Sequence, residues 1–186
     1  MAALLGLAVL ASAAPADAQR PDVRDGSGDV WGRFYSGGGT VPMGSVPNAD
    51  LTRLVVRHSQ TEITAKATYT DLAQGVSTRM WLNLYLRTDQ DQRYLVEVSS
   101  YDQLEQADVA ITMPDGSVIA CPEAVGAVDL KREQLSVRVP RTCLASPAWL
   151  QFRGQAVSFV YKGGSYWDAA FTAKAQNRRW SDRLVP

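Results

Sequence analysis

The stretch Glu62-Ile63-Thr64-Ala65-Lys66-Ala67-Thr68-Tyr69-Thr70 alternates without a break between polar side chains at even positions and apolar ones at odd positions. Successive side chains of a β-strand point to opposite faces of the sheet, so this period of two predicts a strand with one buried and one hydrated face. The preceding segment 51–58 places Leu54 and Val56 on one face, and Ser59-Gln60-Thr61 separates the two segments. Together they predict a β-hairpin.

The same period recurs along most of the chain. Between residues 79 and 87, the even positions are apolar: Met80, Leu82, Leu84 and Leu86. Further strands are expected at 93–100, 109–113, 118–121, 125–130, 135–139, 149–153 and 156–161. About nine or ten short strands separated by turns predict an all-β protein, an antiparallel β-sandwich. The alternative is a small up-and-down barrel that holds a ligand.

The first 18 residues have the pattern of a signal peptide. Residues 2–14 form an apolar run rich in Ala and Leu that is too short to span a bilayer. Pro15-Ala16-Asp17-Ala18 follows, and its small residues match a cleavage site after Ala18. We therefore expect a secreted protein whose remaining part, residues 19–186, forms a single β-sandwich domain.

The charge balance argues against two classes of partner. The chain carries 19 Lys and Arg against 19 Asp and Glu, which predicts no electrostatic affinity for nucleic acid or for anionic membranes. After residue 18, no apolar stretch approaches the roughly 18 residues that a membrane span requires.

Two cysteines, Cys121 and Cys143, are expected to form a disulfide. An exported chain meets an oxidising compartment, and a bridge of this span stabilises a fold by about 3 kcal/mol through loop-closure entropy. Two thiols and the single histidine, His58, are too few for a zinc site built from Cys and His.

Short motifs along the chain resemble a group of uncharacterised secreted bacterial proteins: Asp25-Gly26-Ser27-Gly28-Asp29-Val30, Asn48-Ala49-Asp50-Leu51, Asp71-Leu72, Val139-Pro140-Arg141-Thr142-Cys143-Leu144 and Tyr166-Trp167-Asp168. The sandwich of those proteins resembles DOMON domains and family 9 carbohydrate-binding modules, which bind haem, sugars or calcium. Haem-binding members use Met, His or Lys as axial ligands. Here His58, Met80 and Met113 fit core positions better, so haem is not expected.

One strand carries a candidate carbohydrate site on its outward face: Arg79, Trp81, Asn83, Tyr85 and Arg87. Aromatic rings stack on the C–H faces of sugars, while guanidinium and amide groups donate hydrogen bonds to hydroxyls. The pattern predicts binding of a carbohydrate or a cell-envelope glycan. The alternative is that this face is covered, either by the Gly/Pro-rich loop 37–47 or by the C-terminal segment with Trp167 and Trp180.

The alternating oxygen donors Asp25, Ser27 and Asp29 resemble positions 1, 3 and 5 of a calcium-binding loop. The loop is not an EF-hand, because Val30 and Ser36 stand where Gly and Glu are required. A calcium ion would need further ligands, and the candidates are Asp168, which the resemblance suggests, and Asp50. The alternative is an ordinary polar turn.

These patterns favour a secreted, non-catalytic binding or scaffold domain for a glycan, stabilised by calcium. A Ser-His-Asp triad is not expected, because the chain has one histidine and no Gly-x-Ser-x-Gly motif. Two alternatives remain: a structural or protein-interaction domain without a small ligand, and a secreted hydrolase that uses a pair of carboxylates.

Overall fold

The computed structural model describes residues 21–73, 78–101, 106–160, 163–172, 174 and 179–186. Their elements are β1 (Asp22–Arg24), β2 (Val30–Phe34), β3 (Val41–Gly44), β4 (Leu51–His58), β5 (Glu62–Tyr69), β6 (Thr78–Thr88), β7 (Arg93–Tyr101), β8 (Gln106–Thr112), β9 (Val125–Asp129), β10 (Gln134–Pro140), the short 3-10 helix η1 (Arg141–Leu144), β11 (Leu150–Val160) and β12 (Gly164–Ala169). The predicted all-β class is confirmed. None of the described residues forms a helix that is long and apolar enough to cross a membrane.

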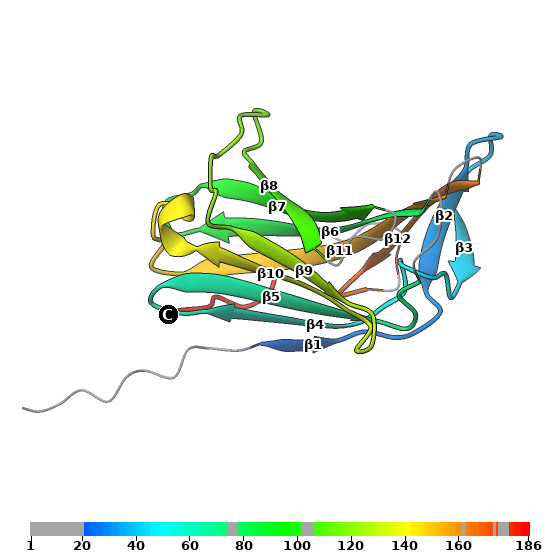
Figure 1. Ribbon diagram of the computed structural model, residues 1–186, viewed down its shortest axis with the longest axis horizontal. Coiled ribbons are helices and arrows are strands. Elements are labelled where there is room, and N and C mark those ends of the chain that lie inside the picture. Colours follow the sequence, from blue (N-terminus) through cyan, green and yellow to red (C-terminus); the bar gives the residue numbers. More distant parts are fainter. Residues whose placement is uncertain (1–20, 74–77, 102–105, 161–162, 173, 175–178) are drawn as a thin grey trace, which may run out of the picture.

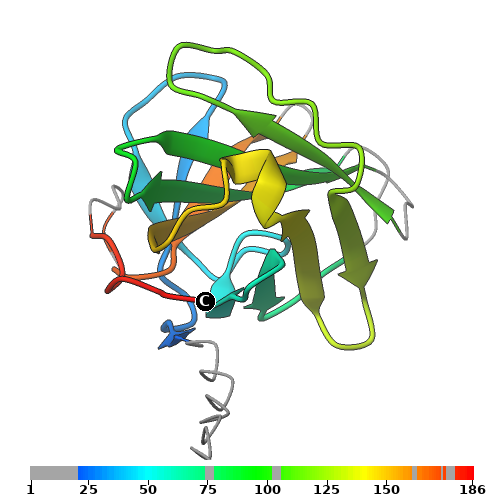
Figure 2. The same cartoon turned by 90° about the vertical axis from the view of Figure 1, so that its left-hand side faces the viewer.

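All twelve strands belong to one antiparallel sheet with the order β1-β4-β5-β10-β9-β8-β7-β6-β11-β12-β2-β3. The sheet curls into a half-barrel with two layers (Figures 1 and 2). The first layer contains β1, β4, β5, β10 and β9, and the second contains β7, β6, β11, β12, β2 and β3. Strand β8 joins them, because its first residues pair with β9 and the rest pair with β7.

The predicted count of nine or ten strands was too low, and the architecture is a single curled sheet rather than a clear sandwich of two sheets. Strands β1 and β3 have only 3 and 4 residues, too few to show a period of two, and β2 and β12 were not predicted either. The predicted strand at 118–121 is not found, because Val118 forms only an isolated bridge with Thr112. The two predicted segments 149–153 and 156–161 form one strand, β11. The up-and-down barrel is not found either, since strand neighbours do not follow the chain order and β1 and β3 end the sheet.

The inner faces of both layers form one hydrophobic core. The predicted apolar faces are confirmed: Leu54 and Val56 of β4 are 0% exposed, and Met80, Leu82, Leu84 and Leu86 of β6 are 7% exposed or less. Phe152 of β11 is among the largest fully buried side chains of the described residues. Each layer therefore supplies the apolar surface that the other one covers.

The C-terminal segment closes the open side of the curl between β11 and β4. Leu184 and Leu150 exchange backbone hydrogen bonds of 2.8 and 3.0 Å, and the backbone N–H of Ser181 donates to the carbonyl oxygen of Phe152 at 2.8 Å. His58 Nδ1 donates to the carbonyl oxygen of Leu184 at 3.1 Å, so the C-terminus lies beside the turn between β4 and β5 (Figure 1). Burial lowers the pKa of His58, and this residue acts as a structural link.

Gly154 of β11 lies where the two layers meet. A methyl group in its place would overlap Cδ2 of Leu54 on β4. We expect Gly154→Ala to destabilise the fold by about 1–3 kcal/mol through overpacking, as measured by urea unfolding. Gly39→Ala is the control, because nothing lies within 4 Å of the added methyl group there. Equal stability of the two variants would show that the layers do not meet at Leu54.

Cys121 and Cys143 form the predicted disulfide, with a sulfur–sulfur distance of 2.06 Å. The bond joins the segment after β8 to η1, and its sulfur atoms are therefore not available as thiolate ligands. We expect the double variant Cys121→Ala/Cys143→Ala to lose about 3 kcal/mol of unfolding free energy, the loop-closure entropy of 22 residues. Peptide mapping without reductant checks the pairing, and two free thiols would contradict it.

Candidate functional site

Four aspartates from three segments of the chain meet at one place between the layers. Asp25 and Asp29 lie in the connection between β1 and β2, Asp50 precedes β4, and Asp168 lies on the inner face of β12. Carboxylate oxygens of Asp29, Asp50 and Asp168 lie within 4.8 Å of one another. Asp25 lies close enough to Asp168 for its charge to affect the Asp168 carboxyl group. The charges of Asp29 and Asp50 in turn affect the carboxyl group of Asp25. We call these four residues the acidic cluster.

Backbone hydrogen bonds hold the cluster in place. The N–H of Asp25 donates to the carbonyl oxygen of Thr52 at 3.0 Å, which keeps the β1–β2 connection beside β4. The N–H of Gly28 donates to both carboxylate oxygens of Asp50, at 3.1 and 3.0 Å. Gly28 has a φ of 80°, a conformation that favours glycine, so the turn toward Asp50 depends on this residue type.

Asp168 links the two layers at the cluster. Its Oδ2 accepts a hydrogen bond from the N–H of Leu51 on β4 at 2.8 Å, and its Oδ1 accepts one from the N–H of Ala169 at 2.7 Å. Asp168 and Asp50 are each 1% exposed. Two carboxylates are therefore buried side by side, an arrangement that is costly unless a cation or protons offset the charge.

Three oxygens at this place are buried without a hydrogen-bond partner among the described residues. They are Asp25 Oδ2, Asp29 Oδ1 and the hydroxyl of Tyr69. Tyr69, at the end of β5, is 2% exposed and feels the charge of Asp168. A buried polar atom without a partner costs about 1–3 kcal/mol, so these three oxygens add to the cost of burying the cluster.

The pKa values respond to the same crowding. Burial, with the charge of Asp29 as the next cause, raises the pKa of Asp25 to about 7. Burial also raises the pKa of Asp168 to about 8, although the hydrogen bond from Leu51 acts in the opposite direction. The pKa of Asp29 is raised as well, again mainly by burial. Burial and mutual repulsion therefore favour protonation of these carboxyl groups, and a nearby positive charge would oppose it.

The structure brings together most of the residues predicted to bind a metal. Asp25, Asp29 and Asp168 converge, and Asp50, the alternative ligand, joins them. Ser27 is exposed on the loop between Asp25 and Asp29. Tyr69 was not predicted, because its odd position in the alternating stretch is the same signal that marks a core residue.

The predicted carbohydrate residues lie on the outer face of β6. Arg79 is exposed, and the other four, Trp81, Asn83, Tyr85 and Arg87, are half-buried. The Trp81 ring packs edge-to-face against Phe159 of β11 and Tyr101 of β7, with centroid distances of 4.8 and 6.0 Å. The Arg79 guanidinium lies 5.2 Å from the centre of the Tyr101 ring.

Two further tryptophans share this face and were not predicted as part of it. In the register of the second layer, Trp81 pairs with Val157, Val157 pairs with Trp167, and Trp167 pairs with Trp31. Directly paired residues of an antiparallel sheet project from the same face. We call this surface, with Trp31, Trp81, Trp167, Tyr101 and Phe159, the aromatic face. No pattern within one strand reveals it, because it depends on the pairing of five strands.

The C-terminal segment covers the other end of the predicted row. The guanidinium of Arg153 lies over the Tyr85 ring at 4.5 Å and over the Trp180 ring at 5.0 Å. At the Tyr85 end of the row, the face is therefore covered by the C-terminal segment with Trp180, which was the expected alternative. Trp167 lies on β12, which β11 separates from the row on β6.

Comparison of the chain with protein-family models, curated proteins and solved structures finds no match.

Proposed function

We propose that the protein is a secreted, non-catalytic binding domain that holds Ca²⁺ in the acidic cluster and binds carbohydrate on the aromatic face. The observation that carries the proposal is the meeting of Asp29, Asp50 and Asp168 within 4.8 Å, from three separate segments of the chain. A cation there would connect the β1–β2 connection, the start of β4 and the inner face of β12. Its role is to stabilise the end of the curled sheet.

The donor set suits calcium better than other common cations. Calcium takes six to eight oxygen ligands in flexible geometry, whereas zinc favours nitrogen and sulfur. The cluster offers carboxylate oxygens, and the unpartnered Tyr69 hydroxyl adds a neutral oxygen nearby. A divalent cation would also remove the repulsion and the burial cost that raise the pKa values of Asp25 and Asp168.

The burial of the cluster supports a structural role over hydrolysis. Raised pKa values are typical of catalytic acids, and the cluster has two such carboxylates, Asp25 and Asp168. A hydrolytic carboxylate must touch its substrate, but Asp50 and Asp168 are each 1% exposed. If the wild type released new sugar ends from a polysaccharide and Asp168→Asn did not, the hydrolase would be favoured instead.

We expect saturating Ca²⁺ to raise the melting temperature of the protein and chelator to lower it. At roughly 100 times the dissociation constant, binding to the native state adds about 2.7 kcal/mol. For a chain of this size, that corresponds to a rise of about 5–10 °C. Differential scanning calorimetry with Ca²⁺, Mg²⁺ and chelator measures the effect.

The variant Asp29→Asn makes the calcium test sharper, because Asp29 Oδ1 has no hydrogen bond to lose. Without Ca²⁺ the variant is expected to be at least as stable as the wild type, since one repelling charge is gone. With Ca²⁺ it should become the less stable protein. Asp108→Asn, which changes an exposed carboxylate on β8, should keep the wild-type response. A full calcium response in Asp29→Asn would contradict the site.

The carbohydrate part of the proposal is supported by the register of the aromatic face. Trp31, Trp81 and Trp167 lie on one face of the second layer, with Val157 of β11 between Trp81 and Trp167, and all three are half-buried. Partly exposed rings in a row can stack on successive sugars, while Arg79 is placed to donate hydrogen bonds to their hydroxyls. The arrangement favours a binding surface over a purely structural domain.

We expect Trp81→Ala to weaken binding to at least one of cellulose, chitin or peptidoglycan in pull-down assays. Trp149→Ala is the matched control, because Trp149 lies outside the aromatic face and stacks on Arg183. It precedes Val157, the residue paired with Trp81, by eight residues, which is about 26 Å along an extended chain. Trp149→Ala should retain the binding. A loss of about 3–5 kcal/mol in the unfolding free energy of Trp81→Ala would assign this ring to the core and refute its role as a sugar platform.

A further inference from the structure

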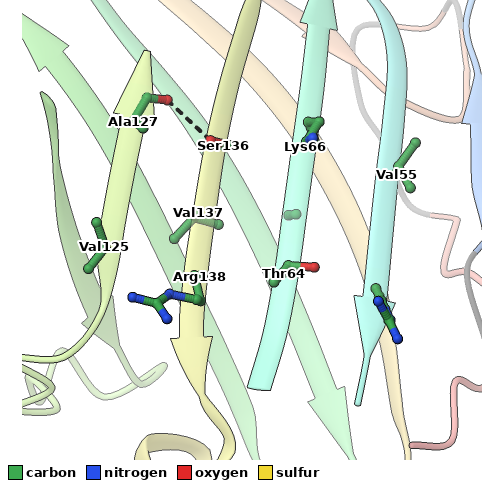
Figure 3. A pocket seen from close by; sticks show the side chains of 10 residues that line it. Val55, Thr64, Lys66, Val125, Ala127, Ser136, Val137 and Arg138 are labelled. Carbon is green, nitrogen blue, oxygen red and sulfur yellow. Dashed lines mark hydrogen bonds between the residues drawn. The ribbon is translucent and has the colours of Figure 1, made fainter. Parts of the chain in front are cut away.

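The outer face of the first layer contains a groove that the proposed function does not use. It has a volume of about 400 Å³ and lies across β4, β5, β10 and β9 (Figure 3). Among the ten residues that line it are three cations, Arg57, Lys66 and Arg138, and two hydroxyl side chains, Thr64 and Ser136. We call it the basic groove.

The sheet register explains why these side chains meet. Arg57 of β4 pairs with Thr64 of β5, and Thr64 pairs with Arg138 of β10. Lys66 lies two residues further along β5, in the next row on the same face, and pairs with Ser136. The two arginines therefore flank Thr64, and Lys66 lies diagonal to both. Figure 3 shows Lys66 and Arg138 on the neighbouring strands β5 and β10.

The groove concentrates positive charge in a chain that has no net charge. The full sequence balances 19 cationic against 19 acidic residues, yet no acidic residue lines the groove. Glu62 lies 3.9 Å from Arg138 at the edge of the groove, and both side chains are exposed. Within the described part of the chain, Arg57 and Lys66 form no ion pair. Like charges on adjacent strands repel one another, so an anion bound between them would be attracted.

We propose that the basic groove binds an oligosaccharide that carries carboxylate groups, such as a chain with uronic acids. Arg57 and Arg138 stand two strands apart, so their Cα atoms are about 10 Å from each other. This spread suits single charges that recur along a chain better than one dense phosphate, which needs several donors at one point. Each guanidinium fork matches a carboxylate with two parallel hydrogen bonds.

The rest of the lining suits sugars. The hydroxyl of Thr64 lies between the two arginines. The hydroxyl of Ser136 donates to the carbonyl oxygen of Ala127 at 3.5 Å and can still accept a hydrogen bond from a sugar hydroxyl. Val55 and Val125 add apolar contact for C–H groups at two sides of the groove. The site belongs to the first layer, so it is independent of the acidic cluster and of the aromatic face.

The test uses the full chain and a hyaluronan oligosaccharide, in which a carboxylate recurs on every second sugar. We expect calorimetric titration at low salt to show binding that weakens as sodium chloride is raised, because the cations are exposed to solvent. A neutral chitin oligosaccharide should not bind in the groove. The variant Arg57→Gln/Lys66→Gln should bind hyaluronan at least tenfold more weakly, with an unchanged melting temperature, since both side chains are exposed.

The matched control is Arg93→Gln/Lys131→Gln, which removes two exposed cations outside the groove and changes the net charge equally. Its dissociation constant for hyaluronan should be within twofold of the wild-type value. The same is expected of Trp81→Ala, and this result would separate the groove from the aromatic face. The proposal is overturned if hyaluronan does not bind at low salt, if the control weakens binding as much as the groove variant, or if poly-L-glutamate binds as tightly as hyaluronan.

Discussion

A twelve-stranded sheet with one apolar face must bury that face against itself, and the other features of the molecule depend on this constraint. Strand β8 pairs with both β7 and β9, so the sheet turns there without a break. The close approach of Leu54 to Gly154 and the backbone bonds of Leu184 complete the enclosure on the opposite side. The disulfide between Cys121 and Cys143 stabilises the connection that leads out of β8.

The acidic cluster is a consequence of the same curl. Asp168 is on the inner face of β12, where its neighbours in the alternating pattern are buried side chains. Its two backbone hydrogen bonds offset part of the burial cost, but Asp25, Asp29 and Asp50 add negative charge beside it. Burial makes this charge expensive, and so it also makes a bound cation effective in joining the layers.

The curl leaves two outer faces with different chemistry. The second layer presents the tryptophans of the aromatic face, and the first layer presents the cations of the basic groove. Antiparallel pairing creates both surfaces, because it aligns every second residue of neighbouring strands on one side. On our proposals, these two surfaces would bind two different glycan chemistries, one on each layer.

The sequence alone predicted the strands β4 to β11 and the direction in which their alternating side chains point. The strict alternation of 62–70 and 79–87 specifies buried and outward faces, and a short-range pattern of Asp25 and Asp29 indicates a place for a cation. The tertiary structure alone decided that the layers form one curled sheet, that Tyr69 lies near Asp168, and that Trp31 and Trp167 lie in register with Trp81. The physical reason is range. Alternation is a property of neighbouring residues, whereas strand order and register come from contacts between segments far apart in the sequence, as in the hydrogen bond between Leu51 and Asp168, which are 117 residues apart.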